Sequence, residues 1–159
     1  FAFELLYSTG IRVSECVNLR FNDIDLEVGS LFVLGKGNKQ RYIPLTAVCQ
    51  KLLKRYFSHQ DTVGPWVFQH RNKKRLSRFF IYGLIKKYTQ KIDKTKSFSV
   101  SPHSFRHAFA THLIEGGAGI REVQLLLGHQ QLASTQIYTQ VSKKYIKQTF
   151  NQAHPRASL

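Results

Sequence analysis

The sequence predicts an α+β fold that is mainly α-helical, with a small three-stranded antiparallel β-meander near the N-terminal side. Apolar residues recur at helical spacing through most of the 159-residue chain. Residues 22–45 break this period, because the short β-type runs NDIDLEV, SLFVLG and QRYIPL alternate there with turn residues. The length allows one domain with one sizeable core, and the hydrophobic fraction of 42% fits a globular protein.

Helices are expected on both sides of the meander. Residues 1–10 read as the end of an amphipathic helix, and the pattern IRVSECVNLRF predicts a second helix with Arg12 at its start. Residues 36–39 (KGNK) form the predicted hairpin turn. A helix over 47–58 should bury Val48, Leu52, Leu53 and Phe57, and the helix LSRFFIYGLIKKYTQK should turn Phe79, Tyr82, Ile85 and Tyr88 inward.

A further helix carries a histidine and an arginine close to its start. Ser101 is a predicted N-cap with Pro102 at the first helical position, and the helix should run to Glu115 and stop at Gly116-Gly117. Residues 103, 106, 107 and 110 share one face, while Phe105, Phe109 and Leu113 look like core. The first turn of such a helix favours an anion. The alternative is an ordinary solvated polar face.

The segment that follows contains a candidate nucleophile. Residues 120–127 predict a short apolar helix that Gly128 closes, with His129 directly after it. Ser134 or Thr135 would then cap another short helix carrying Tyr138. A tyrosine in this setting is more often packed than reactive. Because the free phenol has a pKa near 10, a tyrosine nucleophile needs a base or neighbouring cations.

The charge balance indicates a polyanionic partner. The chain has 24 Lys+Arg against 9 Asp+Glu, a net charge of +15 and a pI near 10.1. Nucleic acid is the first expectation and an anionic membrane surface the second. No apolar run reaches the length of a transmembrane span, and no signal peptide is visible. The basic run HRNKKR is either a solvated loop or a phosphate-contacting segment. The residues expected to contact DNA are Lys39, Arg41, Arg71, Lys73, Lys74, Arg75, Arg78, Lys86 and Lys87.

Cysteines and histidines give no sign of a metal site. Cys16 and Cys49 have no metal-ligand spacing and lie among apolar neighbours, so we expect reduced core residues of a cytosolic protein. His103 and His107 lack the glutamate of an HExxH motif, since Ser104 stands in its place.

Taken in order, TGIRVSE, GKGNK, SPHSFRHAFATHL, LLGH and TQIYT resemble the catalytic domain of tyrosine recombinases of the phage integrase family, and most closely the Xer type. No single motif is specific, but six positions match in order over nearly the whole chain. The resemblance implies that residues 1–159 are one catalytic domain and that an upstream core-binding domain is missing, consistent with a chain that begins at Phe1 and has no methionine. The family's catalytic positions fall on Arg12, Lys36, His103, Arg106, His129 and the nucleophile Tyr138.

The resemblance also implies the reaction. Tyr138 would attack a phosphodiester of double-stranded DNA at a specific recombination site and form a 3′-phosphotyrosyl link, with no metal, ATP or other cofactor. Partners would be DNA and further protomers in a homo- or hetero-tetramer, at the nucleoid and away from membranes. The last basic helix would dock on a neighbouring protomer, or alternatively Tyr145 and Phe150 would pack on their own domain. The rival functions are a type IB topoisomerase and a non-enzymatic DNA-binding module, in which 118–139 would be a helix-turn-helix.

Overall fold

The structure is a computed structural model that describes residues 1–35, 40–59, 64–92, 99–128 and 140–157. Its elements are α1 (Ala2–Thr9), α2 (Val13–Asn18), the 3-10 turn η1 (Phe21–Asp23), β1 (Ile24–Asp25), β2 (Ser30–Leu34), β3 (Gln40–Pro44), α3 (Ala47–Ser58), α4 (Arg78–Ile92), α5 (Pro102–Glu115), α6 (Ile120–Leu127) and α7 (Gln140–Ala153). This arrangement confirms the predicted α+β fold.

The three strands form an antiparallel meander in the order β1-β2-β3. Ile24 pairs with Leu31, and Leu31 pairs in turn with Ile43. Helices α6 and α7 both pack against β3, so residues 41–44 of this strand are all buried. The hairpin turn expected at 36–39 lies outside the described residues.

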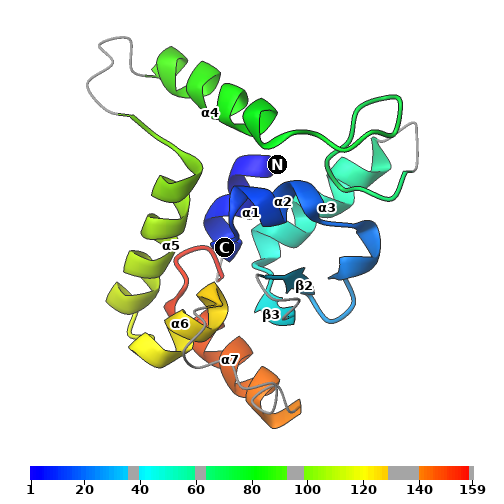
Figure 1. Cartoon of the computed structure of the whole chain (residues 1–159). Helices are drawn as coiled ribbons and strands as arrows, with labels where there is room; N and C mark the ends of the chain where they lie inside the picture. Colours follow the sequence, from blue (N-terminus) through cyan, green and yellow to red (C-terminus); the bar gives the residue numbers. More distant parts are fainter. Residues whose placement is uncertain (36–39, 60–63, 93–98, 129–139, 158–159) are drawn as a thin grey trace.

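Helices α1 and α5 pack against each other, with α1 on the inner side of α5 (Figure 1). Leu5 and Leu6 of α1 and Phe109 and Leu113 of α5 are fully buried, as the apolar spacing predicts. Gly10 ends α1 in the left-handed conformation, and a Cβ at this position would overlap the ring of Phe109. A glycine is therefore required where the chain turns from α1 into α2.

Helix α7 packs on its own chain, against α5 and β3. Phe150 is fully buried and stacks on His154, with ring centroids 4.9 Å apart, whereas Tyr145 is 55% exposed. Arg156, just after the helix, forms an ion pair with Glu4 of α1 at 3.1 Å. Phe150 is thus packed within its own chain, whereas the ring of Tyr145 stays largely exposed and its hydroxyl donates to Glu122 Oε1 at 3.4 Å.

Two further features complete the fold. Cys16 and Cys49 are free and buried, as the sequence predicts. Within the part of the chain that the structure describes, no helix combines the length and hydropathy needed to cross a lipid bilayer.

Candidate active site

Arg12 is placed at the rim of the site by the start of α2. It is the N-cap residue, and its backbone N–H donates to Glu15 Oε2 at 2.7 Å. Its guanidinium donates to Glu15 Oε1 at 3.1 Å, while 41% of the side chain remains exposed. Arg12 is therefore oriented by Glu15 and still open to a ligand.

Arg106 lies deeper and joins three elements. From α5 its Nη1 donates to the carbonyl oxygen of Gly10 at 2.6 Å, and its Nη2 donates to that of Leu127, the last residue of α6, at 2.7 Å. Burial lowers the pKa of Arg106 to about 10, and the charges of Arg12 and Arg41 act in the same direction. The group is still a cation at neutral pH, and a bound anion would relieve this unfavourable environment.

His103 stands one turn before Arg106 on α5. The predicted start of the helix is confirmed: the Ser101 hydroxyl accepts a hydrogen bond from the Ser104 N–H, and Pro102 follows the cap. His103 is exposed, and it shares the first turn with backbone N–H groups that lack a helical partner. The helix thus presents an imidazole and a guanidinium on adjacent turns of one side.

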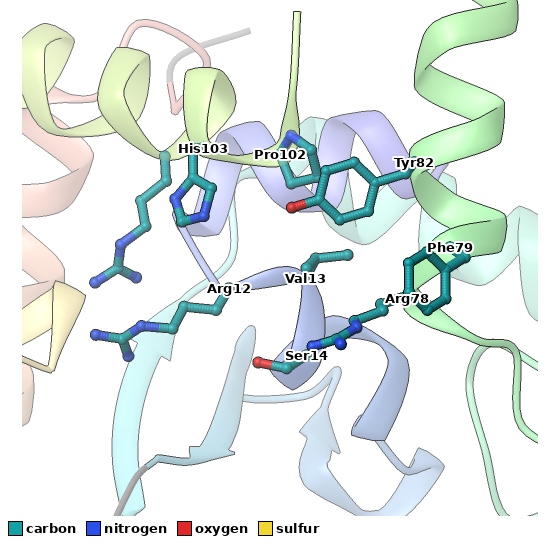
Figure 2. Close-up of a pocket in the computed structure, with 9 residues that line it drawn as sticks. Arg12, Val13, Ser14, Arg78, Phe79, Tyr82, Pro102 and His103 are labelled. Carbon is teal, nitrogen blue, oxygen red and sulfur yellow. The ribbon is translucent and has the colours of Figure 1, made fainter.

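These three side chains border one cavity of about 570 Å³. Figure 2 shows His103 and Arg12 on one side, with Arg78 and Tyr82 of α4 reaching in from the other. Its lining residues come from α2 and its N-cap, from α4 and from α5: Arg12, Val13, Ser14, Arg78, Phe79, Tyr82, Pro102, His103 and Arg106. Segments distant in sequence therefore converge on a hollow with a cationic and aromatic wall.

The orientation of the aromatic side chains of α4 differs from the predicted one. Phe79 is 72% exposed and Tyr82 37% exposed, and both line the cavity instead of facing the core. Tyr88 is 49% exposed, with its ring edge against Phe3. Ile81 and Ile85 are the residues of this helix that are buried, so only Ile85 was assigned correctly.

Arg41 corrects a second prediction. Its side chain is only 4% exposed and forms a two-pronged ion pair with Glu15, with both contacts at 2.8 Å. Its Nε donates to the carbonyl of Leu126 at 2.8 Å. The expected contact of Arg41 with DNA is therefore wrong, because the guanidinium is enclosed by protein. Nothing in the sequence distinguishes this arginine from the exposed ones.

The carboxylate of Glu15 accepts hydrogen bonds from both Arg12 and Arg41. Burial by itself raises the pKa of this carboxyl, but hydrogen bonds and the charge of Arg41, together with Arg12, more than offset it and hold the pKa below its ordinary value. Glu15 is therefore ionised at neutral pH. Glu15 thus forms ion pairs with both Arg12 and Arg41, and Arg41 is the stronger partner.

The basic turn 70–75 is ordered against the loop that precedes it. Gln69 pairs with Arg75 in an isolated β-bridge, and the His70 N–H donates to the Lys74 carbonyl at 2.8 Å. Two guanidinium groups lie over the ring of Trp66, that of Arg20 at 4.8 Å and that of Arg75 at 5.6 Å from the ring centroid. The remaining described residues of the expected DNA-contact set are all exposed: Arg71, Lys73, Lys74, Arg75, Arg78, Lys86 and Lys87.

Several predicted residues lie outside the described part of the chain: Lys36, Lys39, His129 and Tyr138. The segment that leads to two of them is described. Helix α6 spans the predicted residues Ile120–Leu127, and Gly128 caps it in the left-handed conformation. The last two carbonyls of α6 are those bound by Arg41 and Arg106. Among the described residues, no three histidines, cysteines or carboxylates gather in a way that could hold a metal ion.

Comparison with known proteins agrees with this geometry. The sequence model of the phage integrase family matches residues 1–145. Tyrosine recombinase XerD of Staphylococcus saprophyticus is 44% identical over 160 residues, which cover 97% of this chain and 54% of that protein. The chain therefore belongs to the phage integrase family, and it spans about half the length of the curated relatives it matches.

Solved structures give the same result. The crystal structure of XerA recombinase superposes with a TM-score of 0.73 and 33% identity, over 96% of this chain and 57% of that one. XerH recombinase bound to its difH substrate in a pre-cleavage complex superposes with a TM-score of 0.69 and 26% identity, over 82% of this chain and 39% of that one.

Proposed function

We propose that this chain is the catalytic domain of an Xer-like site-specific DNA recombinase, acting in chromosome-dimer resolution or in integration and excision. The observation that carries the proposal is the convergence of Arg12, His103 and Arg106 on one cavity. Arg12 lies more than ninety positions before His103 and Arg106, and together they supply two guanidinium groups and an imidazole to the same space.

Charge placement explains how this site would act on a phosphodiester. The phosphate gathers negative charge on its oxygens as it is attacked. Arg12 and Arg106 would hold these oxygens with forked, permanently charged groups. The Arg106 nitrogens already donate to two carbonyls, so its orientation is fixed before the substrate arrives. This preorganisation is the main source of electrostatic catalysis.

The remaining steps are assigned to residues by their chemistry. Tyr138 would attack the phosphorus and form a 3′-phosphotyrosyl ester, releasing a 5′-hydroxyl. His103 would accept the phenolic proton or relay it, His129 would donate a hydrogen bond to the phosphate, and Lys36 would protonate the departing oxygen. The 5′-hydroxyl of one duplex then attacks the phosphotyrosyl link of the other. Because the ester is retained throughout, strand exchange needs no ATP.

The DNA would lie across the cavity and along the exposed side of α4. Arg78 lines the cavity and is also exposed at the start of α4, and the basic turn 70–75 lies just before it in the chain. Lys86 and Lys87 continue the exposed basic surface along the helix. Lys39 stays a proposed contact. Recombination requires two paired sites, so the active form would be a homo- or hetero-tetramer on double-stranded DNA.

The decisive experiment is covalent capture of DNA on a nicked suicide substrate. The chain should form a protein–DNA adduct that is stable to denaturant, and Tyr138→Phe should form none while it binds DNA with unchanged affinity. An equal loss of binding in that variant would count against the assignment of the nucleophile. If the unaltered chain binds DNA but gives no adduct, it is a non-enzymatic binding module. Strand exchange between two duplexes, compared with relaxation of supercoiled DNA, separates a recombinase from a type IB topoisomerase.

A further inference from the structure

A buried ion pair lies behind the cationic wall of the site. Arg41 on β3 donates from Nη1 and Nη2 to the two carboxylate oxygens of Glu15, at 2.8 Å each. The side chains are only 4% and 6% exposed. Neither residue lines the cavity, and the proposed reaction assigns no step to either.

Glu15 is shared unequally between Arg41 and Arg12. Its Oε1 accepts from Arg41 at 2.8 Å and from Arg12 at 3.1 Å. The contact with Arg41 is buried and two-pronged, whereas the guanidinium of Arg12 makes one contact and stays 41% exposed. A two-pronged arginine–carboxylate contact in a low-dielectric setting is much stronger than a single contact at the surface. Most of the negative charge of Glu15 is therefore compensated by Arg41.

Arg41 determines the net charge beside the cavity. Arg12, Arg41 and Arg106 supply three positive charges and Glu15 one negative charge, which leaves two positive charges (3 − 1) near the cavity. Without Arg41 one positive charge would remain. Arg12 would then be the nearest cation to an otherwise unpaired buried carboxylate, and it would be drawn toward Glu15 and away from the cavity.

We propose that Arg41 is a positioning residue that neutralises Glu15 and so keeps the guanidinium of Arg12 available to the substrate phosphate. This inference rests on the proposed phosphodiester chemistry of the site. Arg41 acts through Arg12 and touches no substrate itself. The Nε contact with Leu126 fixes its direction, and Arg106 binds the neighbouring carbonyl of Leu127.

The test compares Arg41→Met with the double variant Arg41→Met/Glu15→Gln. The single variant leaves the carboxylate to Arg12, so its rate of adduct formation should fall about a hundredfold while its DNA affinity changes less than about threefold. The second substitution removes the charge that captures Arg12. The double variant should therefore form adduct at least about tenfold faster than Arg41→Met. A double variant no faster than the single one overturns the proposal, as does a folded Arg41→Met that cleaves at the original rate.

A second readout does not depend on DNA cleavage. Phenylglyoxal modifies accessible guanidinium groups, and the extent at Arg12 can be followed by peptide mass spectrometry. Labelling of Arg12 should slow in Arg41→Met and recover in the double variant. Unchanged labelling of Arg12 across the three proteins contradicts the proposal. If the unaltered chain forms no adduct, the recombinase function fails, and the order of labelling still decides the role of Arg41.

Arg41→Lys covers the case in which Arg41→Met does not fold. It keeps the positive charge but loses the two-pronged contact. Since the proposal depends on charge, folded Arg41→Lys should retain adduct formation and Arg12 labelling within about tenfold of the unaltered chain. A larger loss in either measurement shows that the shape of the arginine contact is what matters, and it overturns the charge-neutralising role.

Discussion

The guanidinium of Arg106 connects α5 with the end of α1 and the end of α6, because it donates to the carbonyls of Gly10 and Leu127. Arg106→Ala removes both contacts and one charge from the cavity. Loss of a charged donor at such a position costs about 3–4 kcal/mol of transition-state stabilisation, so adduct formation should fall by about two to three orders of magnitude. Single-turnover cleavage of a nicked substrate measures this.

Two comparisons separate chemistry from folding in this experiment. Arg121→Ala removes an exposed arginine of α6 that lies outside the cavity lining, and it should leave the rate of adduct formation unchanged. Arg106→Lys keeps the charge but cannot span two carbonyls and a phosphate, so it should recover only part of the rate. An Arg106→Ala protein that is folded and still cleaves normally would remove Arg106 from the site.

His154 makes the stability of the chain depend on pH. Burial lowers its pKa from 6.5 to about 4, the charges of His112 and Arg156 act in the same direction, and the backbone of Tyr7, as a hydrogen-bond acceptor, acts against the shift. The unfolded chain therefore binds a proton more readily than the folded chain between these two values. The free energy of unfolding should have its full value above pH 6.5. It should fall by on the order of 3 kcal/mol as the pH drops toward 4.

Urea unfolding at a series of pH values checks this expectation. His154→Phe keeps a ring against Phe150 and Phe109 but cannot be protonated, so the loss between pH 6.5 and 4 should shrink. His107→Phe is the matched control, because His107 is exposed on α5. If His154→Phe and the unaltered chain lose stability in parallel over this range, a different group is responsible.

At the scale of one element, α4 contains a glycine that its own packing does not require. Gly83 is exposed, and within the described residues no atom lies within 4 Å of the position that a Cβ would take. Glycine inside a helix costs roughly 0.5–1 kcal/mol relative to alanine. Since Tyr82 beside it lines the cavity, we expect the bare backbone at Gly83 to face DNA at close range.

Gly83→Ala should therefore change two properties in opposite directions. The free energy of unfolding should rise by about 0.5–1 kcal/mol, while DNA affinity falls several-fold because the methyl group holds the helix away from its ligand. Thermal unfolding and a fluorescence binding titration measure the two. Gln90→Ala serves as a control at another exposed position of the same helix, because it leaves the charge of the helix unchanged. A Gly83→Ala protein that is more stable and binds equally well would show that DNA does not approach this face.

Sequence patterns predicted the existence and bounds of the helices more reliably than they predicted which side of each helix is buried. The bounds of α5 and α6 follow from local signals, namely the Ser101 cap, Pro102 and Gly128. In α4 both aromatic and aliphatic residues fit helical spacing, so the pattern does not fix the buried side. Ile81 and Ile85 take the core positions, which leaves Phe79 and Tyr82 on the cavity wall.

The position of Arg41 could not be predicted for a related reason. A strand with one solvated face would alternate buried and exposed residues, and an arginine in it would be expected outside. Strand β3 is covered by α6 and α7, so both of its faces are buried. The burial of Arg41 depends on Glu15, which lies twenty-six positions earlier in the chain and on a different element. Only the tertiary arrangement brings the two together.

At the scale of the whole molecule, basic residues occupy opposite ends of the fold, but only one end carries the cavity. Arg71 and Lys74 belong to the turn that leads into α4, whereas α6 and α7, which carry Arg121 and Lys144, lie at the other end of the molecule (Figure 1). All four are exposed. A net charge of +15 predicts salt-sensitive binding to DNA in general, and the arrangement predicts which charges contribute to it.

Salt titration of DNA binding tests this arrangement with variants of equal charge. Each phosphate contact makes the slope of log K against log salt steeper by about 0.9. Arg71→Gln/Lys74→Gln should therefore make the slope shallower by close to the amount expected for two contacts. Arg121→Gln/Lys144→Gln removes the same two charges and should leave the slope nearly unchanged, because these side chains lie away from the proposed DNA path. Equal reductions in the two variants would mean that DNA responds only to the net charge of the chain. The face formed by the cavity, α4 and the basic turn would then not be where DNA binds.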